Sequence, residues 1–117
     1  MAQAHAASGD IIDVQPLGAA LHQQVTSAFF KSPQMELVRL VLPSGKAMRE
    51  HKVAGEITVQ CIEGLIEFTT PTLSRRLAAG QLIHLAAGEP HALLALADAT
   101  ALLTICLLPA AAVSQAT

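Results

Sequence analysis

Turn-forming residues interrupt this sequence about every 8–12 residues, and the segments between them are short and apolar. Such spacing predicts buried strands, since an amphipathic helix needs a longer segment with apolar residues repeated about every three to four positions. The expected strands span residues 11–14, 25–30, 35–42, 56–62, 65–70, 72–77, 81–85, 91–96 and 101–108. A series of short strands with this spacing predicts an all-β sandwich or barrel.

The abundance of alanine and leucine argues for helices, because both residues favour that conformation. However, no segment of about a dozen residues without glycine or proline shows the apolar periodicity of an amphipathic helix. Packing overrides intrinsic propensity where strands are buried, so we expect the all-β fold.

Composition excludes several classes of protein. With 52% hydrophobic and 14% charged residues, the chain is not an extended disordered protein. Its net charge is −2, and its three aromatic residues are all phenylalanine. The chain therefore lacks the basic surface and the stacking platform that nucleic acids require, and we expect no nucleic-acid partner.

The most hydrophobic stretch, residues 92–113, has nearly the length of a membrane span. Asp98 interrupts it within a predicted turn and Pro109 ends its second half, so we interpret it as two buried strands. Residues 1–10 lack the basic and apolar regions of a signal peptide. Cys61 and Cys106 lie in apolar segments and are expected to be buried, reduced thiols. These features favour a cytoplasmic protein that is not inserted in a membrane.

The chain has the length of one domain. We expect a flexible arm over residues 1–10, a single barrel domain over residues 11–108 and a short tail over residues 109–117. Neither an internal repeat nor a linker divides it.

Two stretches carry a distinctive pattern of glycine and histidine. The first is GKAMREHKVAGEITVQCIEG, residues 45–64, and the second is GQLIHLAAGEPHALLA, residues 80–95. Together they resemble the paired motifs of the cupin superfamily. The resemblance implies an RmlC-like cupin barrel, that is, a β-jelly roll or double-stranded β-helix of two antiparallel sheets around a mostly apolar interior.

In cupins, three histidines and one glutamate from the two motifs bind a divalent metal ion, and this sequence retains only part of that set. His51 and His91 are in register with the motifs. Val53 stands in place of the second histidine, and Ile57 stands where the glutamate is expected. The resemblance therefore implies three alternatives for His51 and His91: a site for one iron, manganese, nickel or zinc ion, a polar pair lining the pocket, or relic histidines at the barrel mouth.

Three further residues are weighed as additional ligands. His84 would be a third ligand if its face points into the barrel, and is otherwise a partly exposed histidine. Cys61 shares the face of Ile57 and would be a soft ligand, with an inert buried thiol as the alternative. Glu56 would need a bulge after Gly55 to turn inward and is otherwise exposed.

We expect the pocket to open between the strand that carries His51 and the strand that starts at His91. The residues predicted to line it are Val53, Ile57, Cys61 and His84. Arg49 has the parity of His51 but is expected to be exposed. Glu63 and Glu67 are expected to face solvent, and no role is assigned to His5 and His22.

Two classes of function remain open, because cupins perform many. The incomplete ligand set favours a module that binds a small organic molecule without turnover. The alternative is a metal-dependent enzyme, an oxygenase or isomerase, that acts on a small organic molecule. The surplus of apolar residues and the resemblance both favour a homodimer.

Overall fold

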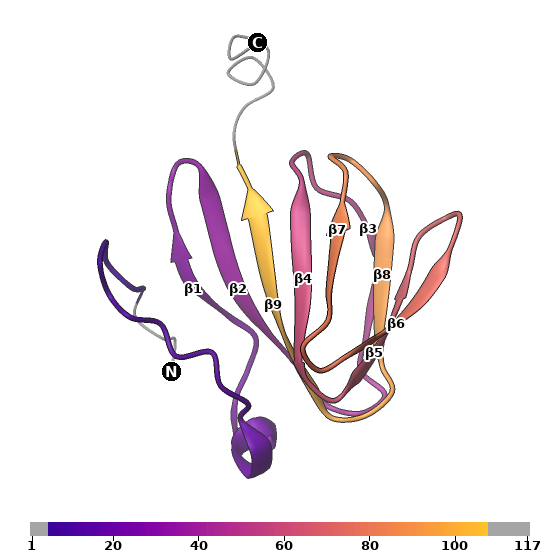
Figure 1. The fold of residues 1–117 in the computed structure, drawn as a ribbon, viewed down its shortest axis with the longest axis horizontal. Helices are drawn as coiled ribbons and strands as arrows, with labels where there is room; N and C mark the ends of the chain where they lie inside the picture. Colours follow the sequence, from indigo (N-terminus) through magenta and orange to yellow (C-terminus); the bar gives the residue numbers. More distant parts are fainter. Residues whose placement is uncertain (1–4, 108–117) are drawn as a thin grey trace, which may run out of the picture.

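A computed structural model of the protein describes residues 5–107, which form nine strands and one short 3₁₀ helix (Figure 1). The helix, η1, covers Gly18–Gln23. The strands are β1 (Ser27–Lys31), β2 (Met35–Leu42), β3 (Ala47–His51), β4 (Ile57–Glu63), β5 (Leu65–Thr69), β6 (Ser74–Ala78), β7 (Leu82–Leu85), β8 (His91–Ala95) and β9 (Ala99–Cys106). The predicted all-β class is confirmed.

Most of the predicted strands are present. Strand β2 has the predicted bounds, and seven others differ from their predicted ends by at most two residues. The strand predicted at 11–14 is wrong, because this segment belongs to neither sheet. The ninth strand is instead β3, which was not among the expected strands. Its sequence, AMREH, is mostly polar and does not show the alternation of apolar and polar residues that predicts a strand.

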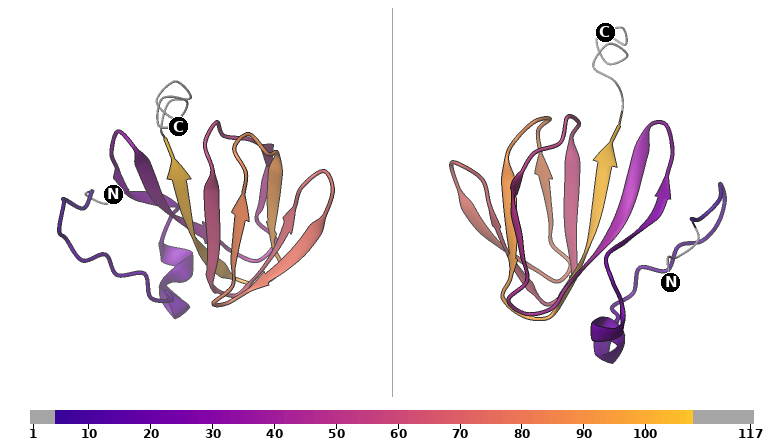
Figure 2. Two further views of the ribbon diagram at one scale, coloured as in Figure 1. Left: turned by 45° about the horizontal axis from the view of Figure 1, so that its top comes forward. Right: turned by 180° about the vertical axis from the view of Figure 1, so that it is seen from behind.

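The strands form two antiparallel sheets that face each other. The larger sheet has the order β1-β2-β9-β4-β7, and the smaller sheet has the order β3-β8-β5-β6. Figures 1 and 2 show the two sheets joined at one end and open at the other, where the loops 52–56 and 86–90 lie. The predicted jelly roll of two antiparallel sheets is confirmed.

The core lies between the two sheets and consists of one contiguous apolar cluster. Alternation along each strand directs one set of side chains into this space and the other set outward. Fully buried members include Val59 and Cys61 on β4 and Ile66 and Phe68 on β5. Burial of each large apolar side chain stabilises the fold by about 1.5–3 kcal/mol, so the cluster holds the two sheets together.

Residues 5–24 cross the outer side of the larger sheet and are tied to it by Glu63 on β4. The Glu63 carboxylate accepts hydrogen bonds from the backbone amides of Leu17 (2.7 Å) and Gly18 (3.0 Å) and from the Thr100 hydroxyl (2.7 Å). Burial raises the pKa of Glu63, but these hydrogen bonds and the charge of Arg39 outweigh it and leave the pKa below its ordinary value. The expectation that Glu63 faces solvent is therefore wrong.

Two further contacts hold the same N-terminal segment. His22, on η1, pairs with Asp98 in the turn between β8 and β9 through Nε2 and Oδ2, 2.8 Å apart. At the other end, the Ala6 amide donates to the Phe29 carbonyl at 2.8 Å. Leu21, which is next to His22 on η1, is buried. His22, to which no role was assigned from the sequence, is thus an anchor of this segment.

No helix within residues 5–107 is long and apolar enough to cross a membrane. The segment around Asp98 forms the predicted turn, which separates β8 from β9. The predicted tail, residues 109–117, lies outside the described residues, as do Leu108 and residues 1–4 of the predicted arm.

Candidate functional site

The two histidines retained from the paired motifs lie directly opposite each other on neighbouring strands. His51 ends β3, His91 begins β8, and the two residues are register partners. Met48 pairs with Leu93, so two residues on β3, Arg49 and Glu50, lie opposite one on β8, Ala92. This irregularity is a β-bulge, and it brings His51 to the same inward face as Met48 although the two are an odd number of residues apart.

The imidazole rings of the two histidines are in contact. Their centroids are 4.4 Å apart, with an angle of 56° between the ring planes. On its other side, His91 stacks on Phe68 at a centroid distance of 5.7 Å with an angle of 6°. His91 is 3% exposed, whereas His51 is exposed at the open end of the barrel. His91 therefore stacks on Phe68 and meets His51 at a tilt, and the three rings run from solvent into the core.

Backbone carbonyls fix which nitrogen of each ring carries a proton. His51 Nδ1 lies 3.0 Å from the Arg49 carbonyl oxygen, and His91 Nδ1 lies 3.1 Å from that of Glu89. A carbonyl only accepts hydrogen bonds, so each Nδ1 must be the protonated donor. In the neutral rings, each Nε2 then carries the lone pair that can accept a hydrogen bond or bind a metal ion.

The two loops at the open end are connected beside this pair. The amide of Gly88, after β7, donates to the carbonyl of Val53, after β3, at 3.0 Å. Gly88 has a φ of +76°, a conformation that side-chain-bearing residues rarely adopt. Val53 is partly buried and packs against the core, and Ile57 is buried in it. The loop that follows His51 is thus held against the apolar core.

The structure corrects the expected position of the pocket. Strands β3 and β8 are hydrogen-bonded neighbours, so no pocket opens between them. Neither His51 nor His91 lines the surface cavities beside Arg39, His84 and Arg75. The pair is accessible from the barrel mouth through the exposed ring of His51.

The remaining candidate residues lie apart from the pair. Cys61 is 0% exposed, within the core, and its thiol donates to the Glu63 carbonyl at 3.3 Å. Burial raises the pKa of the Cys61 thiol, and the Glu63 carboxylate adds to this effect. His84 is exposed on the outer side of the larger sheet, where its Nε2 lies 2.7 Å from Oε1 of Glu56. The condition under which His84 would be a third ligand, an inward-facing side chain, is not met.

The residues present do not fit the metal centre of the cupin motifs. Within residues 5–107, no group of three or more histidine, cysteine, aspartate or glutamate side chains is arranged to hold a metal ion. Protein sites for zinc supply at least three ligands, and His51 and His91 supply two. We therefore derive no chemistry through a metal at this site.

Comparison with solved structures places the fold. A conserved protein of unknown function from Streptococcus pyogenes is similar, with 24% identity, a TM-score of 0.72, and coverage of 94% of this chain and 97% of that one. A cupin superfamily protein from Desulfitobacterium hafniense matches with 15% identity and a TM-score of 0.73 over 88% of this chain and all of that one (100%). An RmlC-like cupin from Desulfovibrio desulfuricans matches with 20% identity and a TM-score of 0.67, covering 88% and 98% of the two chains. This chain has a cupin fold.

Sequence comparison adds no closer relationship. No protein-family model matches the chain, and no curated protein is significantly similar to it. The cupin fold nevertheless explains the glycines of the two motifs. Gly64 has a φ of +83°, and a Cβ there would lie 2.1 Å from the Asp98 carbonyl oxygen. Only glycine fits at this turn of the cupin barrel.

Sequence reasoning missed two features of the cupin site. One is Phe68, which supports His91 and lies outside both motifs. The other is the bulge in β3, which the sequence marks only by the charged residues between Met48 and His51. A search for the aromatic partner of a buried histidine would have found Phe68 among only three phenylalanines.

Proposed function

We propose that this protein binds a small organic molecule at the mouth of its cupin barrel, with His51 and His91 as the polar contacts. The observation that carries the proposal is the fixed orientation of the two rings. Each Nδ1 is held by a carbonyl, and in the neutral ring each Nε2 is left to accept a hydrogen bond. A ligand hydroxyl or amide N–H is the complementary group.

The rest of the mouth suggests the shape of the ligand. Val53, which is partly buried two residues after His51, makes the adjoining surface apolar, and His91 is buried against Phe68. Ligand sites of this kind combine an apolar wall with a few polar groups that set orientation. A compact molecule with an apolar body and one hydrogen-bond donor fits this description.

A fragment titration tests the proposal. Small alcohols and amides with apolar bodies are screened by ligand-observed NMR against the wild type, His51→Ala and His84→Ala. His84→Ala removes another exposed histidine, from the outer side of the barrel. Fragments that bind the wild type and His84→Ala but not His51→Ala support the site. Equal binding to all three proteins contradicts it.

The second candidate, a metal-dependent enzyme, keeps one specific observation in its favour. Two imidazoles with centroids 4.4 Å apart could share one ion if the ligand or water completed its coordination. The lack of a third protein ligand within the described residues disfavours this candidate.

A homodimer is the proposed assembly. Among the described residues, several large apolar side chains are exposed: Ile11, Val25, Met35, Leu82 and Leu96. Covering them by a second copy would remove apolar surface from water. Multi-angle light scattering at tens of micromolar should give twice the mass of the chain, and the monomer mass would contradict the proposal. The two free cysteines fit a reducing compartment, and we propose the cytoplasm.

A further inference from the structure

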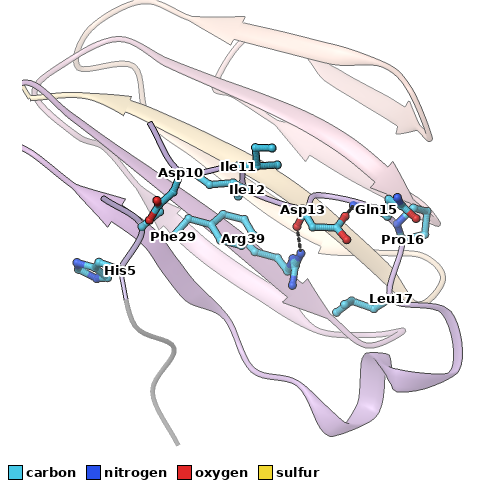
Figure 3. Close-up of a pocket in the computed structure, with 11 residues that line it drawn as sticks. His5, Asp10, Ile11, Ile12, Asp13, Gln15, Pro16, Leu17, Phe29 and Arg39 are labelled. Carbon is cyan, nitrogen blue, oxygen red and sulfur yellow. Dashed lines mark hydrogen bonds between the residues drawn. The ribbon is translucent and has the colours of Figure 1, made fainter. Parts of the chain in front are cut away.

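A cleft of about 740 Å³ lies outside the barrel, between the N-terminal segment and the outer face of β1 and β2 (Figure 3). Its walls come from His5, Ala6 and residues 10–13 and 15–17 on one side and from Phe29 and Arg39 on the other. The histidine pair lies on the other sheet, so this cleft is separate from the site at the barrel mouth. Neither sequence motif contributes to it.

Arg39 is the principal cation of the cleft. Its guanidinium lies over the Phe29 ring, 4.7 Å from the centroid, and its Nη2 donates to the Asp13 carbonyl at 2.7 Å. Within residues 5–107, Arg39 forms no salt bridge, although its charge helps to lower the pKa of Glu63. A guanidinium has five N–H donors in a planar fork that matches a carboxylate, and a single one is used here. Because Phe29 and the Asp13 carbonyl fix its position, the group is pre-organised for an anion.

Two carboxylates face the same cleft. Asp10 Oδ2 accepts a hydrogen bond of 2.8 Å from the Ala7 amide. Asp13 Oδ1 accepts one of 2.9 Å from the Gln15 amide. In each case the second carboxylate oxygen has no hydrogen-bond donor among the described residues. These oxygens would repel a simple anion near Arg39, but they would accept hydrogen bonds from an ammonium group.

The positions of these charges set the distance between the ligand's charges. In Figure 3, Asp10 lies at one end of the cleft, whereas the guanidinium, which lies over the Phe29 ring, is beside Asp13. Ile12, Pro16 and Leu17 provide apolar surface between and beside them. A molecule with an ammonium and a carboxylate several bonds apart, and an apolar group between them, is complementary to this arrangement.

We propose that this cleft binds short peptides with free termini, the carboxylate at Arg39 and the ammonium at Asp10. The proposal is independent of the function assigned to the barrel mouth. It relies on three features of one cavity: a fixed guanidinium without a salt bridge among the described residues, an exposed carboxylate at Asp10 away from that guanidinium, and an apolar lining.

Calorimetry with a dipeptide and its two blocked forms tests the proposal. Leucylglycine is the probe, N-acetyl-leucylglycine lacks the ammonium, and leucylglycinamide lacks the carboxylate. For the wild type, each blocked form should bind at least about tenfold more weakly, since each loses a charge-assisted hydrogen bond. Equal binding of the three compounds, or no binding of leucylglycine at millimolar concentration, overturns the proposal.

Variants assign each charge to its partner. Arg39→Lys keeps the charge but loses the fork, and Arg39→Gln loses both; in Arg39→Gln, leucylglycine and its amide should bind equally. In Asp10→Asn, the preference for leucylglycine over its N-acetyl form should shrink. Arg75→Gln and Glu50→Gln, exposed changes on the smaller sheet, are the matched controls. Circular dichroism confirms that each variant is folded, and unchanged preferences in folded Arg39→Gln overturn the assignment.

Discussion

The Glu63 carboxylate accepts a hydrogen bond of 2.7 Å from the backbone amide of Leu17, although the two residues are 46 positions apart in the chain. The same carboxylate accepts hydrogen bonds from the Gly18 amide and the Thr100 hydroxyl. A single side chain therefore joins the N-terminal segment to β4 and β9. A cleft that depends on the position of residues 10–17 therefore depends on Glu63 as well.

Replacement of Glu63 by glutamine should weaken this attachment. The amide group of glutamine keeps one acceptor oxygen but presents N–H donors to groups that also donate. We expect Glu63→Gln to lower the free energy of unfolding by about 1–3 kcal/mol, as is usual for hydrogen bonds to a charged group. Urea denaturation measures this change. Glu67→Gln on β5 is the control, and an equal loss in both variants would contradict the role of Glu63.

Acidification should release the N-terminal segment. The pKa values of Glu63 and Asp98 lie below their ordinary values of 4.5 and 3.8. At Glu63, burial raises the pKa, but hydrogen bonds from Thr100, Leu17 and Gly18 outweigh it. At Asp98, hydrogen bonds from Ser44 and His22 lower the pKa. A carboxylate with a lowered folded-state pKa stabilises the fold above its ordinary pKa, and this contribution is lost as the pH falls through the folded-state value. The free energy of unfolding should therefore decline below about pH 4.5.

The pH profile can be assigned to its groups. Unfolding is measured from pH 7 to pH 3 for the wild type and Glu63→Gln. The variant should show a shallower decline, because one of the two lowered carboxyl groups has been removed. Identical slopes would show that Glu63 does not contribute to the acid sensitivity.

His91 should matter more for stability than His51. His91 is buried between His51 and Phe68, whereas His51 has one face in solvent. We expect His91→Ala to cost about 2–4 kcal/mol through the cavity it leaves, and His51→Ala less than about 1 kcal/mol. Thermal and urea unfolding of both variants checks the order. The opposite order would mean that the stack does not support the core.

Metal binding by the histidine pair should be weak. Two imidazoles do not complete a protein metal site, and no third ligand is grouped with them in residues 5–107. Protein without an affinity tag, loaded with zinc and dialysed, should retain well below one equivalent by elemental analysis. If the wild type retained one equivalent of zinc and both His51→Ala and His91→Ala lost it, the result would support the metal-dependent enzyme instead.

The two cysteines should differ in reactivity. Cys106 is partly exposed at the end of β9, whereas Cys61 is fully buried with a raised pKa. Because thiolates are the reacting species, a disulfide reagent such as DTNB should label one thiol in the native protein and two after denaturation. Mass spectrometry of the labelled peptide identifies the site, and rapid native labelling of Cys61 would contradict its burial.

The sequence predicted the architecture because two kinds of signal agreed. Turn residues divide the chain into strand-length segments, and motif glycines such as Gly64 and Gly88 occupy positions with positive φ. The segment 11–14 misled the prediction, since its apolar residues resemble a strand while Ile11 is 97% exposed. Local pattern does not reveal whether a neighbouring strand is available to pair.

The site was predictable only in its central pair. Motif register indicated that His51 and His91 share a centre, and their rings are in contact. The direction of the His84 side chain depends on which face of β7 meets the core. Because Leu82 and Leu85 lie on opposite faces of this short strand, the sequence has an apolar residue on each face and does not indicate which one is buried. Glu63 was misjudged because its partners, Leu17 and Thr100, are remote in sequence.

The bulge between Met48 and His51 has a consequence for how such proteins diverge. Deletion of one residue there, for instance Glu50, would make the spacing from Met48 to the histidine even, and a regular strand without a bulge would then still direct the histidine into the barrel. An alignment that requires the present spacing would count the motif as broken although the pair is kept. The face on which this histidine lies is thus set by the spacing and the bulge together, and a single-codon deletion that removes both leaves the pair in place.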